Sequence, residues 1–338
     1  MTVRVAIIGA GVMGNAHSDA YVRIPDANVT AVVDVDIERA GKIALAHGAR
    51  AYSVVAEMCA RERIDMADIC TPTSTHKDLV ILCADQGMHV MVEKPIAHTL
   101  EEARSMLEAV QRNSVIFMVA QVLRFWPEYA YLKQAYDKEP FGRLIQAWFS
   151  RVCSTPAPER DGWPGNRERS GLAALELHIH DLDFIYYMLG RPSAVSSVEI
   201  NRPDIGISYL KTQYQYRDLP GVVIEAEGGW WRGPIPFSAG FRAVFEKAVL
   251  VYAGEQLTLY EAGTSDPRKF DLVSDLTGRD ANNLKSTNAY FNEIEYFVGC
   301  VHTNTPPAVI TANHSYAVLE ILNAERQSAR SGLIERSE

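Results

Sequence analysis

The chain of 338 residues lacks an apolar run of about 18 residues, the length that a membrane-spanning helix needs. It also lacks any arginine- or lysine-rich run, and 42 acidic residues outnumber 33 basic ones, for a net charge of −9. A negative chain of this kind disfavours a surface that binds nucleic acid or another polyanion. We therefore expect neither a membrane partner nor a nucleic-acid partner.

Cysteine is scarce as well. The five cysteines are an odd number, and no two are spaced as Cys-x-x-Cys. This pattern favours reduced thiols over a disulfide framework. A strand-like segment already begins at Val3, which argues against a secretory leader in this sequence. Together these features predict a folded cytoplasmic protein, long enough for two domains.

A glycine motif near the start points to a nucleotide. The apolar run Val3–Ile8 ends in Gly9-Ala10-Gly11-Val12-Met13-Gly14. A helix-like segment follows, as in a dinucleotide-binding βαβ unit. Gly9 allows a tight turn, Gly11 a close approach of the pyrophosphate, and Gly14 close packing of helix on strand. An ordinary glycine-rich turn is the less favoured alternative, and we expect the helix start at Val12 and Met13 to bind phosphate.

Asp34 indicates which dinucleotide is bound. It lies twenty residues after Gly14, at the end of a second apolar run. A carboxylate there accepts hydrogen bonds from the adenosine ribose and repels a 2′-phosphate. We predict NAD as the cofactor, with NADP disfavoured. The alternative, that Asp34 only caps the next helix, is weakened because Asp36 can form that cap.

Short apolar segments alternate with amphipathic ones over the first 120 residues. The predicted strands are Val3–Ile8, Val29–Val33, Arg50–Tyr52, Met66–Ile69, His89–Val92 and Val115–Val119. The predicted helices are Met13–Val22, Ile37–His47, Val54–Arg61, Lys77–Gln86 and Leu100–Arg112. This alternation predicts a doubly wound parallel sheet. Residues 1–121 are therefore expected to form an NAD-binding Rossmann domain.

The pattern changes after residue 121, where strand follows strand. The predicted strands are Leu144–Arg151, Ala194–Asn201, Tyr209–Tyr216, Val222–Trp231, Phe241–Phe245, Ala248–Ala253 and Gln256–Tyr260. The predicted helices are Pro127–Lys138, Leu172–Leu189, Ala289–His302 and Ala312–Ser331, and residues 154–171 have the composition of a loop. Residues 122–338 are expected to form a second α/β domain with a large, mostly antiparallel sheet.

Two further loops follow strands of the first domain. After Met66–Ile69 come Thr71, Pro72 and Thr73, where threonine hydroxyls can contact a nucleotide and Thr75 is expected to cap the next helix. After the strand that ends near Val92 comes Glu93-Lys94-Pro95. A lysine beside the nicotinamide can bind the reacting oxygen and stabilise its developing negative charge. The alternative, a solvated turn, is usual for such a pair elsewhere.

These residues resemble the glucose-fructose oxidoreductase, inositol dehydrogenase and rhizopine catabolism family (Gfo/Idh/MocA). The matching pieces are the glycine motif, Asp34, Thr71-Pro72-Thr73, His76, Glu93-Lys94-Pro95, Gln121, Arg124-Phe125, Ser170-Gly171, His178-Ile179-His180-Asp181, Tyr290, Glu293-Ile294, Phe297 and Pro306-Pro307. The resemblance implies that the matching residues of the first domain, from the glycine motif up to and including Gln121, contact the cofactor. It also implies a sugar or cyclitol dehydrogenase in which Lys94 serves at the nicotinamide. The outer sheet would build a homodimer or homotetramer.

The resemblance also places His180 at the family's catalytic histidine. Glu176 stands where family members have aspartate, and His178 where many have glycine. The residues themselves agree, because Glu176 and His180 are four apart and share a helix face. The carboxylate would orient the imidazole, which accepts the hydroxyl proton. A metal site at His178 and His180 is disfavoured, because residues two apart diverge on a helix; we expect no metal.

Three further residues are weaker candidates for binding the substrate. They are Arg124, Trp163 and His178. The alternatives are a salt bridge for Arg124, a buried loop anchor for Trp163, and an interface histidine for His178. We predict an NAD-dependent enzyme that oxidises a secondary hydroxyl of a polyhydroxylated substrate to a ketone. The rival functions are a carbonyl or imine reductase of a non-sugar substrate and a non-catalytic NAD(H)-sensing regulator.

Overall fold

The computed structural model describes residues 2–156, 172–272 and 288–337. The chain forms two compact units. The first contains Met1–Val122 and Asn288–Tyr316, and the second contains Leu123–Thr287 and Ala317–Glu338. Within the described residues, no helix is both long enough and apolar enough to cross a membrane.

The first unit is built on a six-stranded sheet in which every pair is parallel, in the order β3-β2-β1-β4-β5-β6. Its strands are β1 (Val3–Ile8), β2 (Ala27–Val33), β3 (Arg50–Tyr52), β4 (Met66–Ile69), β5 (His89–Glu93) and β6 (Phe117–Ala120). The predicted doubly wound sheet is therefore confirmed. The strand order reverses between β1 and β4, and the carboxyl ends of strands at such a reversal are where ligands bind.

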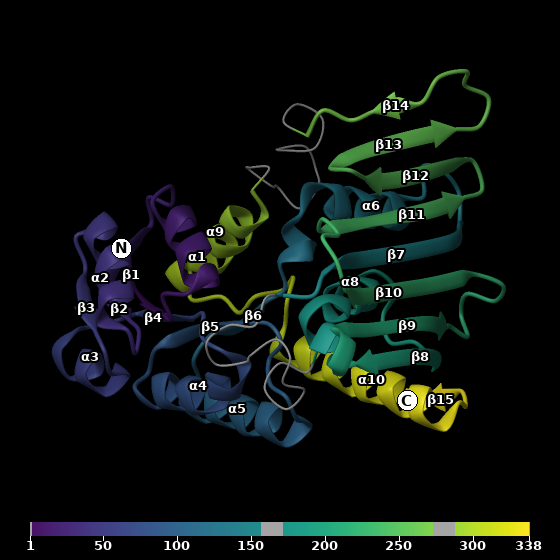
Figure 1. Ribbon diagram of the computed structural model, residues 1–338. Helices are drawn as coiled ribbons and strands as arrows, with labels where there is room; N and C mark the ends of the chain where they lie inside the picture. The colour runs from purple at the N-terminus through teal and green to yellow at the C-terminus, as the bar shows by residue number, and fades with distance from the viewer. Residues whose placement is uncertain (1, 157–171, 273–287, 338) are drawn as a thin grey trace. The chain divides into compact units, whose positions relative to one another are not determined.

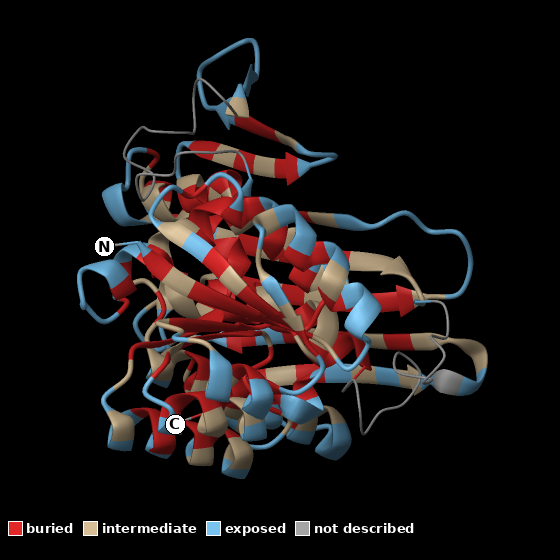
Figure 2. Ribbon diagram, turned by 90° about the vertical axis from the view of Figure 1, so that its left-hand side faces the viewer, coloured by how far each residue is buried: buried red, intermediate tan, exposed pale blue. Residues whose placement is uncertain are grey.

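Helices accompany this sheet, with their exposed faces outward and the strands mostly buried (Figure 2). They are α1 (Val12–Tyr21), α2 (Ile37–His47), α3 (Val55–Arg61), α4 (His76–Asp85) and α5 (Leu100–Asn113), with a short 3-10 turn at Thr73–Thr75. A late segment, α9 (Ala289–His302), also belongs to this unit and packs against α1, and Arg23, which follows α1, lies over the Phe291 ring of α9 at 4.6 Å.

A side-chain cap explains where α2 begins, but α4 has no such cap. Asp36 accepts hydrogen bonds from the backbone N–H groups of Glu38 and Arg39 at the start of α2, as predicted. The prediction that Thr75 caps the following helix is wrong. Thr75 precedes α4 without a capping bond, because its hydroxyl lies 2.7 Å from the Pro72 carbonyl and 2.7 Å from the Thr71 hydroxyl instead.

The second unit contains a nine-stranded sheet in the order β14-β13-β12-β11-β7-β10-β9-β8-β15 (Figure 1). Its strands are β7 (Leu144–Ser154), β8 (Ala194–Arg202), β9 (Ile207–Gln215), β10 (Val223–Trp231), β11 (Ser238–Phe245), β12 (Ala248–Ala253), β13 (Gln256–Glu261), β14 (Arg268–Lys269) and β15 (Glu335–Arg336). All neighbours are antiparallel except β7 and β10. The predicted mostly antiparallel sheet is confirmed, with two short edge strands that the sequence pattern did not reveal.

One face of this sheet packs against helices. These are α6 (Pro127–Lys138), α8 (Ile179–Leu189) and α10 (Ala312–Ser331), with 3-10 turns at Val122–Phe125 and Pro203–Ile205. Tyr129 of α6 is central to the core, because its ring contacts Phe149, Phe184 and Phe241, with centroid separations of 6.5, 5.0 and 5.1 Å. The contacts with Phe184 and Phe241 are edge-to-face and the one with Phe149 is stacked, and both kinds add to the stabilisation from apolar burial.

The predicted helix over residues 172–189 is not uniformly α-helical. Ala174–His178 form one π-turn, which leads directly into α8. A π-turn inserts an extra residue into a helix and is found mostly at functional sites. The join between the π-turn and α8 falls between Glu176 and His180, the two residues predicted to act together.

A buried carboxyl in the second unit predicts a pH-dependent stability. Burial raises the pKa of Glu128 on α6 to about 7, and the residue is 1% exposed. Between pH 4.5 and 7 the folded protein keeps this proton while the unfolded chain releases it, so stability falls as pH rises. Glu128→Gln is expected to raise the free energy of unfolding at pH 8 by about 2–3 kcal/mol.

Urea unfolding of both proteins at pH 4.5 and pH 8 measures this effect. At pH 4.5 the two proteins should agree within about 1 kcal/mol, because the carboxyl is then protonated in the folded protein and about half protonated in the unfolded chain. Glu108→Gln, at an exposed position of α5, is the matched control and should change little at either pH. Equal stabilities of Glu128→Gln and the parent protein at pH 8 would refute the assignment.

Candidate functional site

The glycine loop leaves room for a ligand above α1. Gly9 has a φ of +104°, and a Cβ there would lie 2.7 Å from the Cys70 carbonyl oxygen. A Cβ at Gly14 would lie 1.9 Å from the Gly9 carbonyl oxygen, so only glycine fits where helix meets strand. A Cβ at Gly11 would meet nothing within 4 Å. Gly11 precedes α1 without a side-chain cap, which leaves the first N–H groups of the helix available to an anion.

Val12 and Met13 form the exposed start of this helix. Val12 is 82% exposed, although it is a large apolar residue. An exposed valine beside open space and uncapped N–H groups fits a position covered by a bound group. The residues present therefore suit a pyrophosphate at this helix start.

Asp34 ties the glycine loop to the end of β2. Its carboxylate accepts hydrogen bonds from the Ala10 N–H at 2.7 Å and from the Asp36 N–H at 2.8 Å. The Arg39 guanidinium lies 3.5 Å from the same carboxylate. The carboxylate is thus held beside the loop at the position where a dinucleotide ribose is recognised.

The loop after β4 is joined to the turn after β5 by one histidine. His76 is fully buried, and its ring nitrogens lie 3.0 Å from the Pro95 carbonyl oxygen and 2.9 Å from the Thr71 carbonyl oxygen. Thr73 is also buried, at the start of the 3-10 turn. His76 thereby connects the Thr71-Pro72-Thr73 segment to the Lys94-Pro95 turn.

Lys94 sits directly after β5, and its backbone is held by its neighbour. The Lys94 N–H donates to the Glu93 carboxylate at 2.9 Å, and the Lys94–Pro95 peptide bond is cis. Lys94 itself is only partly buried. Gln121 follows β6 and is 1% exposed, yet its side-chain carbonyl oxygen has no hydrogen-bond partner. A buried polar atom of this kind suits a polar ligand.

Three buried polar residues of this unit were missed by sequence reasoning. His17 on α1, Asp68 on β4 and Cys70 lie together, with the His17 Nδ1 atom 2.9 Å from Asp68. One signal was present in the sequence, because Asp68 interrupts an otherwise apolar strand. A carboxylate in a buried strand requires a partner.

In the second unit, three predicted site residues lie in or just after the π-turn and differ in their exposure to solvent. Glu176 and His180 are both partly exposed, whereas His178 is fully buried. The His178 Nε2 atom lies 3.0 Å from Glu325 of α10 and 3.2 Å from the Tyr214 hydroxyl. These contacts favour the alternative interpretation of His178, as a buried histidine held by its neighbours, over a contact with substrate.

Arg124 also serves packing. Its guanidinium is fully buried and donates two hydrogen bonds to Asp183, at 2.8 and 2.6 Å, while it stacks over the Tyr187 ring. Such a bidentate pair fixes α8 against the turn that precedes α6. The predicted alternative for Arg124 was a surface salt bridge; the observed bridge is buried. Trp163 lies outside the described residues.

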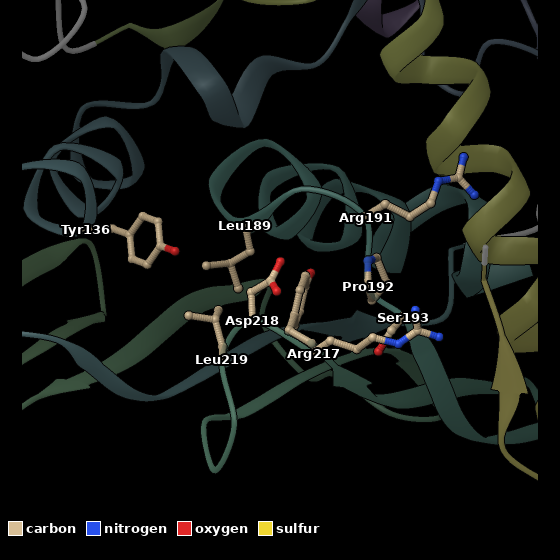
Figure 3. A pocket seen from close by; sticks show the side chains of 9 residues that line it. Tyr136, Leu189, Arg191, Pro192, Ser193, Arg217, Asp218 and Leu219 are labelled. Carbon is tan, nitrogen blue, oxygen red and sulfur yellow. The ribbon is translucent and has the colours of Figure 1, made fainter.

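A surface pocket of about 450 Å³ lies elsewhere in the second unit, near the end of α8 (Figure 3). Tyr136, Arg191 and Asp218 line it, but none of the predicted site residues does. Arg191 is already held by Glu320 at 2.5 Å. We therefore assign no role in the reaction to this pocket.

Comparison with known proteins agrees with both units. Residues 3–121 match the model of an oxidoreductase family with an NAD-binding Rossmann fold, and residues 129–227 match the Gfo/Idh/MocA C-terminal domain. The chain is 34% identical over 337 residues to an inositol 2-dehydrogenase of Rhizobium meliloti (strain 1021), covering 97% of each chain. It is 29% identical over 345 residues to scyllo-inositol 2-dehydrogenase (NAD(+)) of Bacillus subtilis (strain 168), covering 98% of this chain and 95% of that one.

A similar solved structure is levoglucosan dehydrogenase in complex with NADH and levoglucosan. It superposes with a TM-score of 0.88 at 20% sequence identity, and the match covers 100% of both chains. At this identity the likeness establishes the fold.

Proposed function

Because the chain belongs to the Gfo/Idh/MocA oxidoreductase family, we propose that it oxidises a secondary hydroxyl of a sugar, sugar derivative or cyclitol to a ketone, reversibly and with NAD. The proposal rests above all on the 34% identity to an inositol 2-dehydrogenase over nearly the full length of both chains. The partly exposed Glu176 and His180, beside a buried His178, support it.

The first unit would hold the cofactor through the residues described above. The start of α1 would bind the pyrophosphate and Asp34 the adenosine ribose. The Thr71-Pro72-Thr73 loop and Gln121 would complete the site, with His76 and Glu93 fixing the backbone around Lys94. When bound, the nicotinamide accepts the hydride at its C4 atom.

The protein's own groups would then handle the hydroxyl proton. Lys94 would hydrogen-bond the substrate oxygen and stabilise negative charge as it develops there. His180 would take the hydroxyl proton as a general base. Glu176, one helical turn earlier, would orient the imidazole and favour its protonated form. Glutamate keeps the charge of the aspartate usual in the family but reaches one methylene further.

The choice between NAD and NADP can be tested at Asp34. Asp34→Ser removes the charge that repels a 2′-phosphate and leaves Arg39 nearby to attract it. We expect the ratio of kcat/KM for NADP to that for NAD to rise about 10- to 100-fold, roughly 1–3 kcal/mol in differential binding. Asp36→Asn, which keeps the cap on α2, is the control. An unchanged ratio in Asp34→Ser would rule out this role.

The open face of the nine-stranded sheet supports a homodimer or homotetramer. Val198 and Ile200 of β8 are 63% and 43% exposed, and the Trp231 ring contacts the Tyr209 ring on the same, helix-free side. Apolar side chains gathered on one sheet face favour association. Sedimentation equilibrium should therefore find a dimer or tetramer, which Val198→Glu combined with Ile200→Glu weakens. A monomeric parent protein would contradict this part of the proposal.

We place the protein in the cytoplasm. All five cysteines are free, including the buried Cys70, Cys83 and Cys300. Unpaired thiols in this number suit a reducing compartment.

The experiment that tests the proposal incubates the protein with NAD and a panel of sugars, anhydrosugars and inositols, and follows NADH by its absorbance. At least one polyol should give turnover that depends on both protein and NAD. Turnover only with non-sugar carbonyls and NADH would support the reductase alternative. Tight NADH binding without turnover of any compound would support the sensor alternative.

A further inference from the structure

A buried histidine connects the cofactor helix to the lysine turn. His17 lies on α1 with no solvent exposure. Its Nδ1 atom is 2.9 Å from an Asp68 oxygen, and its Nε2 atom is 3.2 Å from a Glu93 oxygen. The two carboxylates come from neighbouring strands, β4 and β5. A single ring therefore bridges three elements of the first unit.

Both ring nitrogens of His17 face carboxylate oxygens. A neutral imidazole carries one N–H, so its other nitrogen would direct a lone pair at a carboxylate. Only the imidazolium places an N–H at both carboxylates, where it forms a hydrogen bond with Asp68 and a close ion pair, rather than an aligned hydrogen bond, with Glu93. Burial opposes its charge, yet the Asp68 carboxylate holds the pKa of His17 well above its usual value. Burial likewise opposes ionisation of Glu93, but His17 keeps the pKa of this carboxyl below its usual value.

The other groups around His17 fit this charge state. Tyr21 donates its hydroxyl to Asp68 at 3.0 Å, and the Tyr290 ring of α9 lies 6.0 Å from the imidazole. Burial raises the pKa of the Cys70 thiol, which leaves it neutral. Glu293 of α9 is buried near Tyr21. Two carboxylates, Asp68 and Glu93, thus surround one imidazolium. Lys94, which is positively charged, follows Glu93 directly in the chain.

A metal ion fits this cluster less well than a proton does. His17, Asp68 and Cys70 lie close enough to suggest a metal site. Two ligand atoms on a tetrahedral zinc are held about 3.3 Å apart, as follows from zinc–ligand bonds of about 2 Å. The separation of 2.9 Å between His17 Nδ1 and Asp68 is that of a hydrogen bond.

We propose that His17 is a positioning residue: a permanently charged imidazolium that orients Glu93, and through Glu93 the backbone of Lys94. One Glu93 oxygen meets His17, and the other accepts the Lys94 N–H at 2.9 Å. Because His17 also belongs to the helix that starts at the glycine loop, it fixes the lysine turn relative to the pyrophosphate site. The catalytic consequence rests on the proposed function; the protonation of His17 does not.

The protonation is tested on the unmodified protein by NMR with histidine ring nitrogens labelled with ¹⁵N. At pH 8 one ring should carry protons on both nitrogens. Tyr21→Phe, which removes only the hydroxyl that contacts Asp68, should shift that ring's signals and so assign them to His17. A His17 ring that is singly protonated at pH 8 would overturn the proposal, whatever the reaction of the enzyme.

The positioning role is tested with His17→Gln. Loss of the imidazolium should lower kcat about 10- to 100-fold, as expected for a misplaced catalytic group. The KM for NAD and the NADH dissociation constant from fluorescence titration should change less than about threefold. His302→Gln, at the end of α9, is the control. A normal kcat in folded His17→Gln would overturn the role.

The pH profile separates positioning from a loss of packing. In His17→Gln, Glu93 loses its charged partner, so its pKa rises and kcat gains a new increase with pH. The double variant His17→Gln with Glu93→Gln should lose that increase, since the amide cannot ionise. An increase that persists in the double variant would show that the effect does not pass through Glu93. If Lys94→Ala retains full activity, the proposed role of Lys94 fails, and if the protein turns over no polyol, the proposed function fails; in both cases the NMR result still decides the charge of His17.

Discussion

Lys94→Ala is expected to lower kcat about 100- to 1000-fold, the loss found when one donor to a developing oxyanion is removed. The expected cause is that the reacting oxygen of the substrate loses a charged hydrogen-bond donor at the moment when the hydride leaves. The Glu93–Lys94 backbone bond survives the change, because it uses the N–H of residue 94 rather than its side chain. The NADH dissociation constant should therefore change little. Steady-state kinetics and NADH fluorescence titration measure the two quantities.

Lys77→Ala is the matched control for this variant. Lys77 lies in the first turn of α4 and pairs only loosely with Asp78, at 3.6 Å. It should keep full activity. If Lys94→Ala also turns over at nearly the normal rate, Lys94 does not serve the chemistry and the proposed mechanism is wrong.

His180→Ala is the second large effect. Loss of a general base lowers kcat about 100- to 10,000-fold. The pH profile is the sharper readout, because the limb that reports ionisation of His180 should disappear. Glu176→Gln keeps the shape of the side chain but removes its charge. It should shift that limb to lower pH, since the imidazolium loses a stabilising carboxylate.

The conservative comparison is His302→Ala, at the exposed end of α9, which should behave like the parent protein. If His180→Ala keeps both the rate and the pH-dependent limb of kcat, a group other than His180 accepts the hydroxyl proton. A Glu176→Gln profile that coincides with the parent's would remove Glu176 from the mechanism while leaving His180 in place.

Much of the first unit follows from local sequence. The strand Val3–Ile8 and the helix Ile37–His47 were predicted with the observed bounds, because a buried parallel strand is a short apolar run and Asp36 marks the helix start. Thr75 shows the limit of this reasoning. Its hydroxyl had several nearby acceptors, and only the three-dimensional turn decides among them.

Features that depend on distant contacts were not predictable. The segment Asn288–Tyr316 returns to the first unit after all strands of the second sheet except β15, and no local pattern encodes that return. The π-turn at Ala174–His178 has the same apolar spacing as an ordinary helix. The strand Arg268–Lys269 is too short and polar to be recognised by alternation.

The candidate site likewise contains some residues that the sequence reveals and others that only the fold brings together. Glycine spacing and the Glu93-Lys94-Pro95 turn carry their chemistry in consecutive residues, so the sequence reveals them. His17, Asp68 and Glu93 come from three separate elements, and their contact depends on strand order. The burial of His178 against Glu325 depends on a helix about 150 residues further along the chain.

The central claim is that Lys94 and His180 act on the same hydroxyl of the substrate. A crystal structure of the protein with NADH and the polyol that gives the fastest turnover tests it most directly. The account predicts one substrate oxygen within about 3 Å of both the Lys94 Nζ atom and a ring nitrogen of His180. A bound polyol whose reacting oxygen touches neither residue, or only one of them, would contradict it.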